Sequence, residues 1–313
     1  MLRFVASLLV TALTPAVVAQ EIPGLRASLF GRSLVPATAN VELRLVLQAD
    51  ADLELPAALL SGVDLAVKCD DATVPFPAQP GKPGMVALAG GTIIERTLRF
   101  PASAFVVGVP TDRIANVSVT VVGLPAAACA FKIAPDVSKL DVSTLDLAKT
   151  EVVLVTNFGD MRVSFRPDKA PKTVAAFIDL CRQGFYDGTK FYRVVRDFMI
   201  QGGCPLSKDD TQQQAWGGGT NGVRLKAEWS DLRHLRGTLA MARGDHPDSA
   251  DCHFFLVHKD SPHLDGRYTA FGNLEAGADV LDRIAETPVG GPKRETPLRH
   301  VILHAAIVLP VKK

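Results

Sequence analysis

The sequence is short of three features: long apolar runs beyond its first twenty residues, net charge, and cysteine. Lys and Arg number 34 and Asp and Glu 33, so long-range attraction to phosphate is weak and no nucleic-acid partner is expected. A membrane-spanning helix needs about 18 or more consecutive apolar residues, and no such run follows residue 20. Five cysteines without CxxC or Cys/His ligand spacing exclude a disulfide-built miniprotein and predict no metal site.

The composition that is present, 47% apolar and 21% charged residues, is typical of a globular protein, and 313 residues suggest about two domains. Residues 1–20 predict a signal peptide, because Arg3 precedes an apolar run and small residues follow Pro15. An uncleaved anchor or a buried first helix is the alternative. Export would place the protein in the periplasm or outside the cell, where a Cys69–Cys129 disulfide could form, although five buried thiols are equally compatible with the sequence.

Residues 21–140 predict a small β-sandwich domain, for which an immunoglobulin-like arrangement is one option, and the sequence does not reveal its role. Apolar residues alternate with polar ones over residues 41–47, 92–100 and 117–121, which indicates half-buried strands. Turn signals rich in proline and glycine separate these strands. A polar run then predicts a linker over residues 141–148, followed by a second domain.

The second domain, residues 149–310, combines several predicted strands with two helices. Strands at 149–158 and 161–165 form a hairpin, and a helix covers residues 171–184. Another helix, 278–285, precedes a closing strand at 300–309. Mostly strands with two helices predict a closed antiparallel barrel capped by those helices.

Three segments of this domain carry the chemistry: FYRVVRDFMIQGG at Phe191–Gly203, GTLAMARGDHPDSADCHFF at Gly237–Phe255, and HLDGRYTAFG at His263–Gly272. Arg193 alternates with apolar neighbours along the first of these strands, which places it on an apolar face. Such an arginine loses hydration and needs partners. Taken alone, it fits either a catalytic cation or an ion-paired structural residue.

In this order and spacing, the segments resemble the cyclophilin-type peptidyl-prolyl cis–trans isomerases over Lys149–Leu309. The resemblance implies a mainly β fold with an eight-stranded closed barrel capped by two helices. It also implies proline-containing polypeptides as substrates, no cofactor and no metal, and Arg193 as the catalytic residue. The substrate-binding residues that it implies are Phe198, Met199, Gln201, Ala242, Arg243, His253, Phe255, His263, Leu264 and Tyr268.

The chemistry suits these residue types. Rotation about an amide has a barrier of about 18–20 kcal/mol, and the twisted transition state gives the prolyl nitrogen a usable lone pair. A guanidinium aimed at that nitrogen stabilises the twisted state more than the planar one. We therefore expect a peptidyl-prolyl isomerase that assists the folding of exported proteins. A proline-peptide binding module or scaffold with little turnover is the alternative.

Three positions depart from the family pattern. His253 stands where glutamine is common, and His263 stands where many members have tryptophan, so binding of a cyclosporin-type inhibitor is expected to be weakened. Tyr268 occupies a pocket position often held by histidine. We expect His253 to be neutral at pH 7, because Arg193 beside it is permanently charged, and turnover to fall as the histidine gains a proton between pH 7 and about pH 5.

Overall fold

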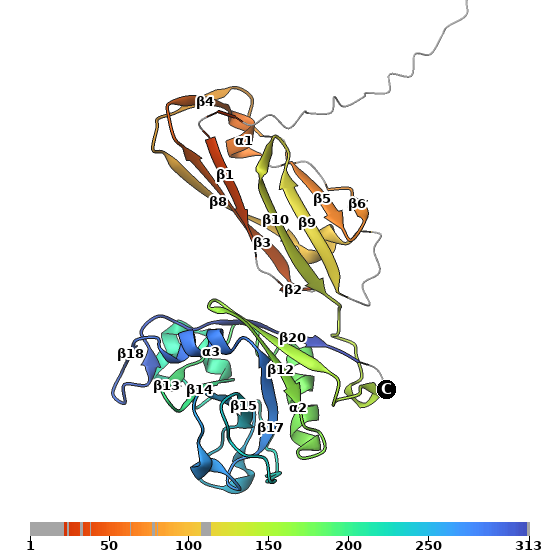
Figure 1. The fold of residues 1–313 in the computed structure, drawn as a ribbon, viewed down its shortest axis with the longest axis vertical. Helices are drawn as coiled ribbons and strands as arrows, with labels where there is room; N and C mark the ends of the chain where they lie inside the picture. Colours follow the sequence, from red (N-terminus) through yellow and green to blue (C-terminus); the bar gives the residue numbers. More distant parts are fainter. Residues whose placement is uncertain are drawn as a thin grey trace, which may run out of the picture. The chain divides into compact units, whose positions relative to one another are not determined.

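The computed structural model divides the chain into two compact units, residues 1–133 and 134–313 (Figure 1). It describes residues 22–23, 25–31, 34–37, 39–62, 64–76, 79, 81–107 and 114–311. The predicted signal peptide lies outside these residues. Among the helices that are described, none is long and apolar enough to cross a membrane.

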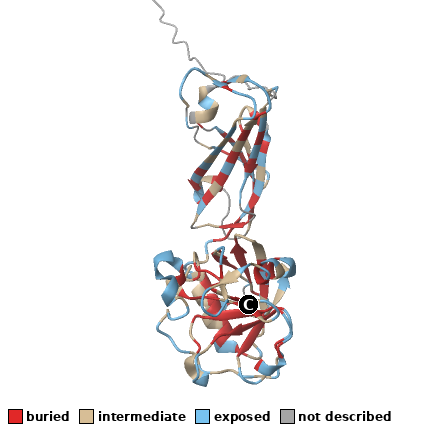
Figure 2. Ribbon diagram, turned by 90° about the vertical axis from the view of Figure 1, so that its left-hand side faces the viewer, coloured by how far each residue is buried: buried red, intermediate tan, exposed pale blue. Residues whose placement is uncertain are grey.

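Two sheets make up most of the first unit, a three-stranded sheet in the order β1-β3-β8 and a five-stranded sheet in the order β2-β10-β9-β5-β6. Buried and exposed residues alternate along these strands (Figure 2). The inward-facing residues of both sheets belong to one hydrophobic cluster, to which Leu43, Leu45 and Val119 contribute fully buried side chains. The elements are β1 Leu25–Phe30, β2 Leu34–Pro36, β3 Asn40–Ala49, β4 Leu53–Pro56, α1 Ala57–Ser61, β5 Leu65–Cys69, β6 Ala72–Val74, β7 Met85–Leu88, β8 Ile93–Pro101, β9 Ala115–Val121 and β10 Leu124–Ala134.

The cysteines of the first unit are thiols, so a Cys69–Cys129 disulfide is not formed. Cys69 pairs with Val117 of β9, and Cys129 pairs with Val119 on the other side of the same strand. Two strand spacings of about 4.8 Å therefore separate the cysteines, beyond the roughly 7 Å Cα separation that a disulfide tolerates. Burial raises the pKa of Cys129 to about 11, which keeps that thiol protonated and unreactive.

An eight-stranded sheet in the order β13-β14-β16-β15-β17-β12-β11-β20 forms the second unit and curls into a half-barrel (Figure 1). Its strand pairs are antiparallel. The helix α2 begins at Pro171 as predicted, and buries Val174, Phe177, Ile178 and Cys181 on one face. The elements are β11 Glu151–Thr156, β12 Gly159–Phe165, α2 Pro171–Arg182, β13 Arg193–Val195, β14 Met199–Gly202, β15 Thr238–Met241, β16 Phe254–Val257, β17 Ala270–Ala276, α3 Ala278–Ala285, β18 Val289–Gly290, β19 Thr296–Pro297 and β20 Leu303–Leu309.

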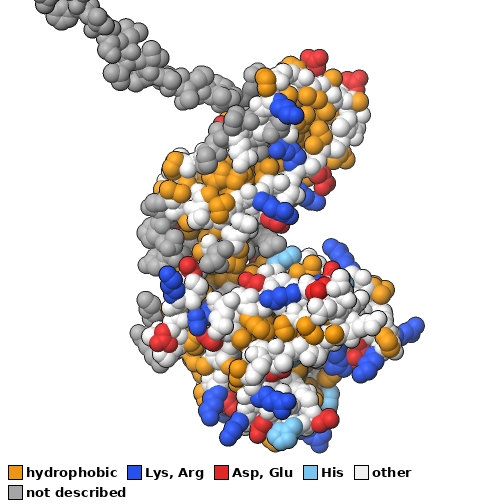
Figure 3. Space-filling view, turned by 180° about the vertical axis from the view of Figure 1, so that it is seen from behind, with side chains coloured by type: hydrophobic (Ala, Val, Ile, Leu, Met, Phe, Trp, Pro, Cys, Tyr) orange, Lys and Arg blue, Asp and Glu red, His pale blue; other side chains and the backbone are white. Residues whose placement is uncertain are grey.

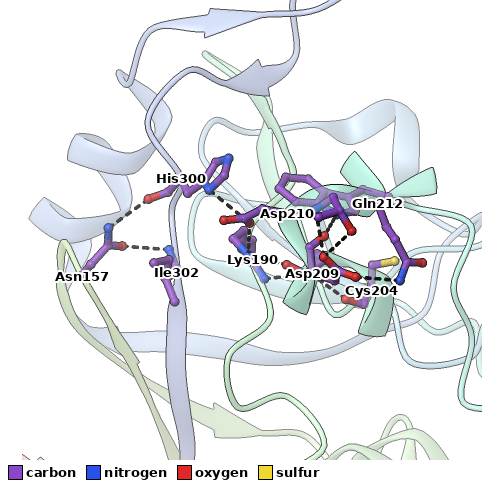
Figure 4. A network of polar contacts seen from close by, with 11 residues as sticks. Asn157, Lys190, Cys204, Asp209, Asp210, Gln212, His300 and Ile302 are labelled. Atoms are coloured by element: carbon purple, nitrogen blue, oxygen red, sulfur yellow. Dashed lines mark hydrogen bonds and ion pairs between the residues drawn. The ribbon is translucent and has the colours of Figure 1, made fainter. Parts of the chain in front are cut away.

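A polar network connects the segments that precede the edge strands β13 and β20 (Figure 4). Lys190 forms an isolated β-bridge with Ile302, and its ammonium lies 2.7 Å from a carboxylate oxygen of Asp210. His300 contacts the same carboxylate at 3.4 Å, and the Asn157 amide donates to the His300 carbonyl at 2.9 Å. The network thus ties the loop that contains Asp210 to both edges of the sheet.

Charges of both signs are interspersed over the face of the second unit that Figure 3 presents. The second unit has exposed ion pairs, such as Arg283 with Asp279 at 2.6 Å and Arg236 with Asp282 at 2.8 Å. Exposed pairs of this kind contribute little to stability. This mixing agrees with the near balance of positive and negative residues in the sequence, 34 against 33.

The predicted linker, residues 141–148, is part of the second unit. Leu145 is 0% exposed and belongs to the core cluster of that unit, and Val142 and Leu147 pack against the same cluster. The segment therefore packs as a strap on the core instead of spanning two domains. Its three apolar residues are spaced among Asp, Ser and Thr, so the polar composition of the run concealed them.

We predict that a chain begun at Ala134 unfolds at a clearly higher temperature than one begun at Lys149. Burial of one leucine is worth about 1.5–3 kcal/mol, which corresponds to a midpoint higher by about 3–12 °C in a unit of this size. Thermal unfolding by circular dichroism measures the difference. Leu145→Ala in the longer chain is the matched control and should reproduce most of the loss, whereas equal midpoints for the two chains would show that the strap contributes nothing.

Candidate active site

Arg193 lies at the start of the edge strand β13, opposite Gln201 of β14, and Gln201 is opposite Phe255 of β16. Directly paired residues project from the same face of a sheet, so the three side chains lie in one row. The Nη1 atom of Arg193 donates to Gln201 Oε1 at 3.3 Å and lies 4.0 Å from the sulfur of Met199. Strand pairing alone thus brings the predicted cation next to its predicted neighbours.

Beside this row is a small apolar cluster that is distinct from the main core of the unit. Phe198 and Tyr268 pack against its edge, and the ring of Tyr268 meets that of Phe255 edge-on at 5.9 Å. The His263 ring lies 5.4 Å from the ring of Phe198. The cluster consists of Met199, Ala240, Ala242, Phe255, Val257, Leu264 and Ala270. The structure therefore brings together all the predicted apolar pocket residues.

A hollow of about 230 Å³ adjoins Gln201. Arg243 borders it, and its guanidinium lies over the Tyr268 ring at 4.7 Å from the ring centre. Arg243 is fixed by its own neighbourhood, since Nη1 donates to the Gly244 carbonyl at 2.8 Å. The other lining residues are Gly217, Gly218, Gly219, Ala242, Gly244, Ser249, Asp251 and His253.

A chain of hydrogen bonds runs from Arg193 to the wall of this hollow. The Gln201 amide nitrogen donates to the Tyr192 hydroxyl, and this hydroxyl lies 2.8 Å from His253 Nδ1. His253 Nε2 lies 2.6 Å from the Gly219 carbonyl oxygen. Tyr192 was not predicted, because simple strand alternation places the neighbour of Arg193 on the opposite face. It precedes the first residue of β13, where that alternation does not yet apply.

Glu295 is the second site residue that the sequence did not indicate. Its carboxylate forms a hydrogen-bonded ion pair with Arg193, with Nε 2.7 Å from Oε2 and Nη2 3.1 Å from Oε1. The two residues are 102 positions apart. No short motif could have revealed this contact, which supplies the partner that an arginine on an apolar face needs.

His253 differs from expectation in its charge. Burial lowers the pKa of His253, but hydrogen bonds with the Cys204 and Cys252 thiols outweigh burial and raise it to about 12. The 2.6 Å contact with the Gly219 carbonyl is as short as a charge-assisted hydrogen bond. The ring is therefore protonated at pH 7, and the expected neutral histidine that titrates between pH 7 and pH 5 is wrong.

Cys204 is the counterpart of this histidine. Burial raises the pKa of the Cys204 thiol, but a hydrogen bond from His253 and backbone N–H groups that include that of Gly217 lower it to about 7. The Gly217 N–H lies 3.2 Å from the sulfur. The two groups therefore form a coupled pair in which each favours the charged form of the other.

In the part of the chain that the structure describes, Asp251, Cys252 and His253 form one group of possible metal ligands, with ligand atoms within 4.8 Å of one another. Both ring nitrogens of His253 already have partners, Tyr192 and Gly219. A carboxylate oxygen of Asp251 accepts the backbone N–H of Cys252 at 2.6 Å. Because these bonds would have to break first, the group does not fit a metal ion.

An arginine beside an apolar pocket on a curled antiparallel sheet suits an enzyme that holds an apolar ring and acts on it electrostatically. The family model "Cyclophilin type peptidyl-prolyl cis-trans isomerase/CLD" matches residues 151–307, half of the chain. The chain therefore belongs to the cyclophilin-type peptidyl-prolyl cis–trans isomerases, as the sequence motifs predicted.

Named relatives agree over the same half of the chain. A probable peptidyl-prolyl cis–trans isomerase of Brucella abortus is 36% identical over 162 residues, which cover 50% of this chain and 82% of the relative. A peptidyl-prolyl cis–trans isomerase of Synechococcus elongatus is 41% identical over 126 residues, 40% of this chain and 81% of the relative. A cyclophilin-type isomerase of Cryptosporidium parvum, crystallised in the presence of the dipeptide Ala-Pro, is 27% identical with a TM-score of 0.45, covering 52% of this chain and 99% of that one.

We predict that one thiol of the folded protein, Cys204, titrates with a midpoint of about 7. The pKa of Cys204 in the folded protein is below that of an exposed thiol, which is about 8.5. The contribution of the Cys204–His253 pair to the stability of the fold is therefore complete above about pH 8.5 and is lost as the pH falls through about 7. The ultraviolet absorbance of the thiolate against pH measures this transition. It should be missing from Cys204→Ser and should move to higher pH in His253→Gln; an unchanged curve in Cys204→Ser would contradict the assignment.

We also predict that Tyr192→Phe lowers kcat/KM for a proline peptide by about threefold to tenfold, because one bridging hydrogen bond is worth about 0.5–1.5 kcal/mol. Isomerase activity on a short peptide is the measurement. Tyr186→Phe is the matched control, since the buried Tyr186 hydroxyl donates to the Cys252 carbonyl at 3.0 Å within the core. The control should lose stability but keep its activity, and equal activities for the two variants would show that the bridge is irrelevant to turnover.

Proposed function

We propose that the second unit isomerises Xaa-Pro peptide bonds in exported polypeptides, with Arg193 as the catalytic residue. The observation that supports this most directly is the position of Arg193 Nη1, at hydrogen-bond distance from Gln201 and in contact with Met199 of the apolar cluster. A proline ring in that cluster would bring the prolyl nitrogen towards the same donor. No covalent bond needs to break in such a reaction.

The proposed mechanism uses differences between the planar and the twisted amide. In the planar amide the prolyl nitrogen shares its lone pair with the carbonyl and accepts hydrogen bonds poorly. As the bond twists, that lone pair becomes available and the Arg193 guanidinium stabilises it, which lowers the barrier. Gln201, linked to Tyr192, is proposed to restrain the peptide backbone while the far side of the bond rotates.

The hollow next to Gln201 is proposed to take the substrate residues that precede the proline. Its wall includes the guanidinium of Arg243, which is held over Tyr268, and the protonated His253. His263 packs on Phe198 at the other end of the pocket, where the family often has tryptophan. We therefore propose that a cyclosporin-type inhibitor binds weakly, while proline peptides retain their pocket.

Three further proposals concern the fold of the two units and the destination of the chain. The shared core of its two sheets supports a β-sandwich for the first unit, and the N-terminal twenty residues support export to the periplasm or beyond. Hydrogen bonds between the segments preceding β13 and β20, such as Phe191 N–H to the Val301 carbonyl at 2.9 Å, support closure of the curled sheet into a barrel. Uncatalysed prolyl isomerisation takes tens to hundreds of seconds, slow enough for exported chains to benefit from a catalyst.

We predict that Arg193→Ala folds normally and loses about 100-fold to 1,000-fold in kcat/KM, since removal of one oriented donor typically costs about 2.7–4 kcal/mol of transition-state stabilisation. A coupled or NMR exchange assay on a short proline peptide measures the loss. Arg196→Ala is the matched control, because the Arg196 side chain is 68% exposed and lies 3.6 Å from the Glu286 carboxylate, outside the pocket described above. A variant within twofold of wild type would refute catalysis by Arg193 and favour the alternative, a proline-peptide binding module.

A further inference from the structure

The catalytic guanidinium has two edges, and they are used differently. Glu295 occupies the edge formed by Nε and Nη2 with two hydrogen bonds, of 2.7 and 3.1 Å. The remaining nitrogen, Nη1, faces Met199 and Gln201. A two-point contact between planar groups fixes the direction of the arginine as well as attracting its charge.

The pair is only partly exposed to solvent. The Arg193 side chain is 35% exposed and that of Glu295 is 25% exposed. Water and salt therefore weaken this interaction less than they weaken the surface pairs of the same unit. The Arg193 hydrogen bond lowers the pKa of Glu295, in spite of its partial burial, so the carboxylate is ionised at neutral pH.

The backbone that carries Glu295 is fixed to the strand that carries Arg193. The Val194 N–H donates to the Glu295 carbonyl at 2.7 Å. Glu295 directly precedes β19, which pairs with β18, and the turn before it is closed by a 3.0 Å bond from the Arg294 N–H to the Gly291 carbonyl. Arg294 has a left-handed φ of 54°, a conformation that non-glycine residues keep only where their surroundings impose it.

An arginine side chain has several rotatable bonds and, if free, would spread its donors over many directions. Catalysis requires one donor to wait at the position where the lone pair develops. We propose that Glu295 is a positioning residue for the isomerase reaction, which clamps one edge of the Arg193 guanidinium so that Nη1 points over the proline pocket. This inference rests on the proposed catalytic role of Arg193.

The first test is Glu295→Gln in the full chain. The amide keeps the size of the side chain but turns one acceptor into a donor, so one arm of the clamp is lost. We expect kcat to fall about tenfold, which corresponds to about 1.4 kcal/mol, with KM changed less than twofold because the pocket is intact. Glu286→Gln is the matched control, because Glu286 contacts Arg196, which lies three residues after Arg193. This substitution should leave kcat unchanged.

The second test separates positioning from a purely structural contribution. A lysine at position 193 cannot form a two-point clamp, so Glu295→Gln should change kcat less than twofold when made in Arg193→Lys. The inference would be overturned if Glu295→Gln lowered kcat by the same factor in the wild-type protein and in Arg193→Lys. It would also be overturned if kcat of Glu295→Gln stayed within twofold of wild type. Arg193→Ala tests the proposed function separately. An active Arg193→Ala would overturn both.

Discussion

A guanidinium beside an apolar pocket is the constraint on which the second unit depends. Such a group loses hydration and keeps its place only if the fold supplies partners on every free side. Here Gln201 comes from the neighbouring strand and Glu295 from the hairpin against β13, while Met199 and Phe255 provide the apolar wall. Strand pairing brings Gln201, Met199 and Phe255 to Arg193, and the segment that leads into β19 adds Glu295.

A close backbone approach supports the polar side of the site. Gly203 has a φ of 92°, and a Cβ there would lie 2.3 Å from the Cys252 carbonyl oxygen. The chain can therefore leave β14 against the start of β16 only with glycine at this position. The turn that follows leads directly to Cys204, whose hydrogen bond with His253 raises the pKa of the histidine.

Local sequence patterns predicted the helices and strands of both units. They did not predict the contacts between segments that are distant in the sequence. The periodic residues of α2 and α3 and the alternation along β3 and β9 could be read directly, because each reports burial of its own face. The motifs identified the pocket residues through a family resemblance. Glu295, the Cys204–His253 pair and the strap around Leu145 depend on tertiary placement, which neither spacing nor composition encodes. The expected disulfide failed for the same reason, since β9 lies between the two cysteines.

The order of strands determines when the second unit can fold during synthesis of the chain. The strand β11, at the start of the second unit, pairs along its length with β20. Residues 151–156 therefore gain this strand partner only once residues 303–309 have been synthesised. Glu295 and the edge strand β20 both come from the last part of the described chain. As the chain leaves the ribosome from its N-terminus, the core of the first unit can form early, whereas the complete sheet that holds Arg193 can form only after almost the whole sequence has emerged. Catalysis is the last property that the growing chain acquires.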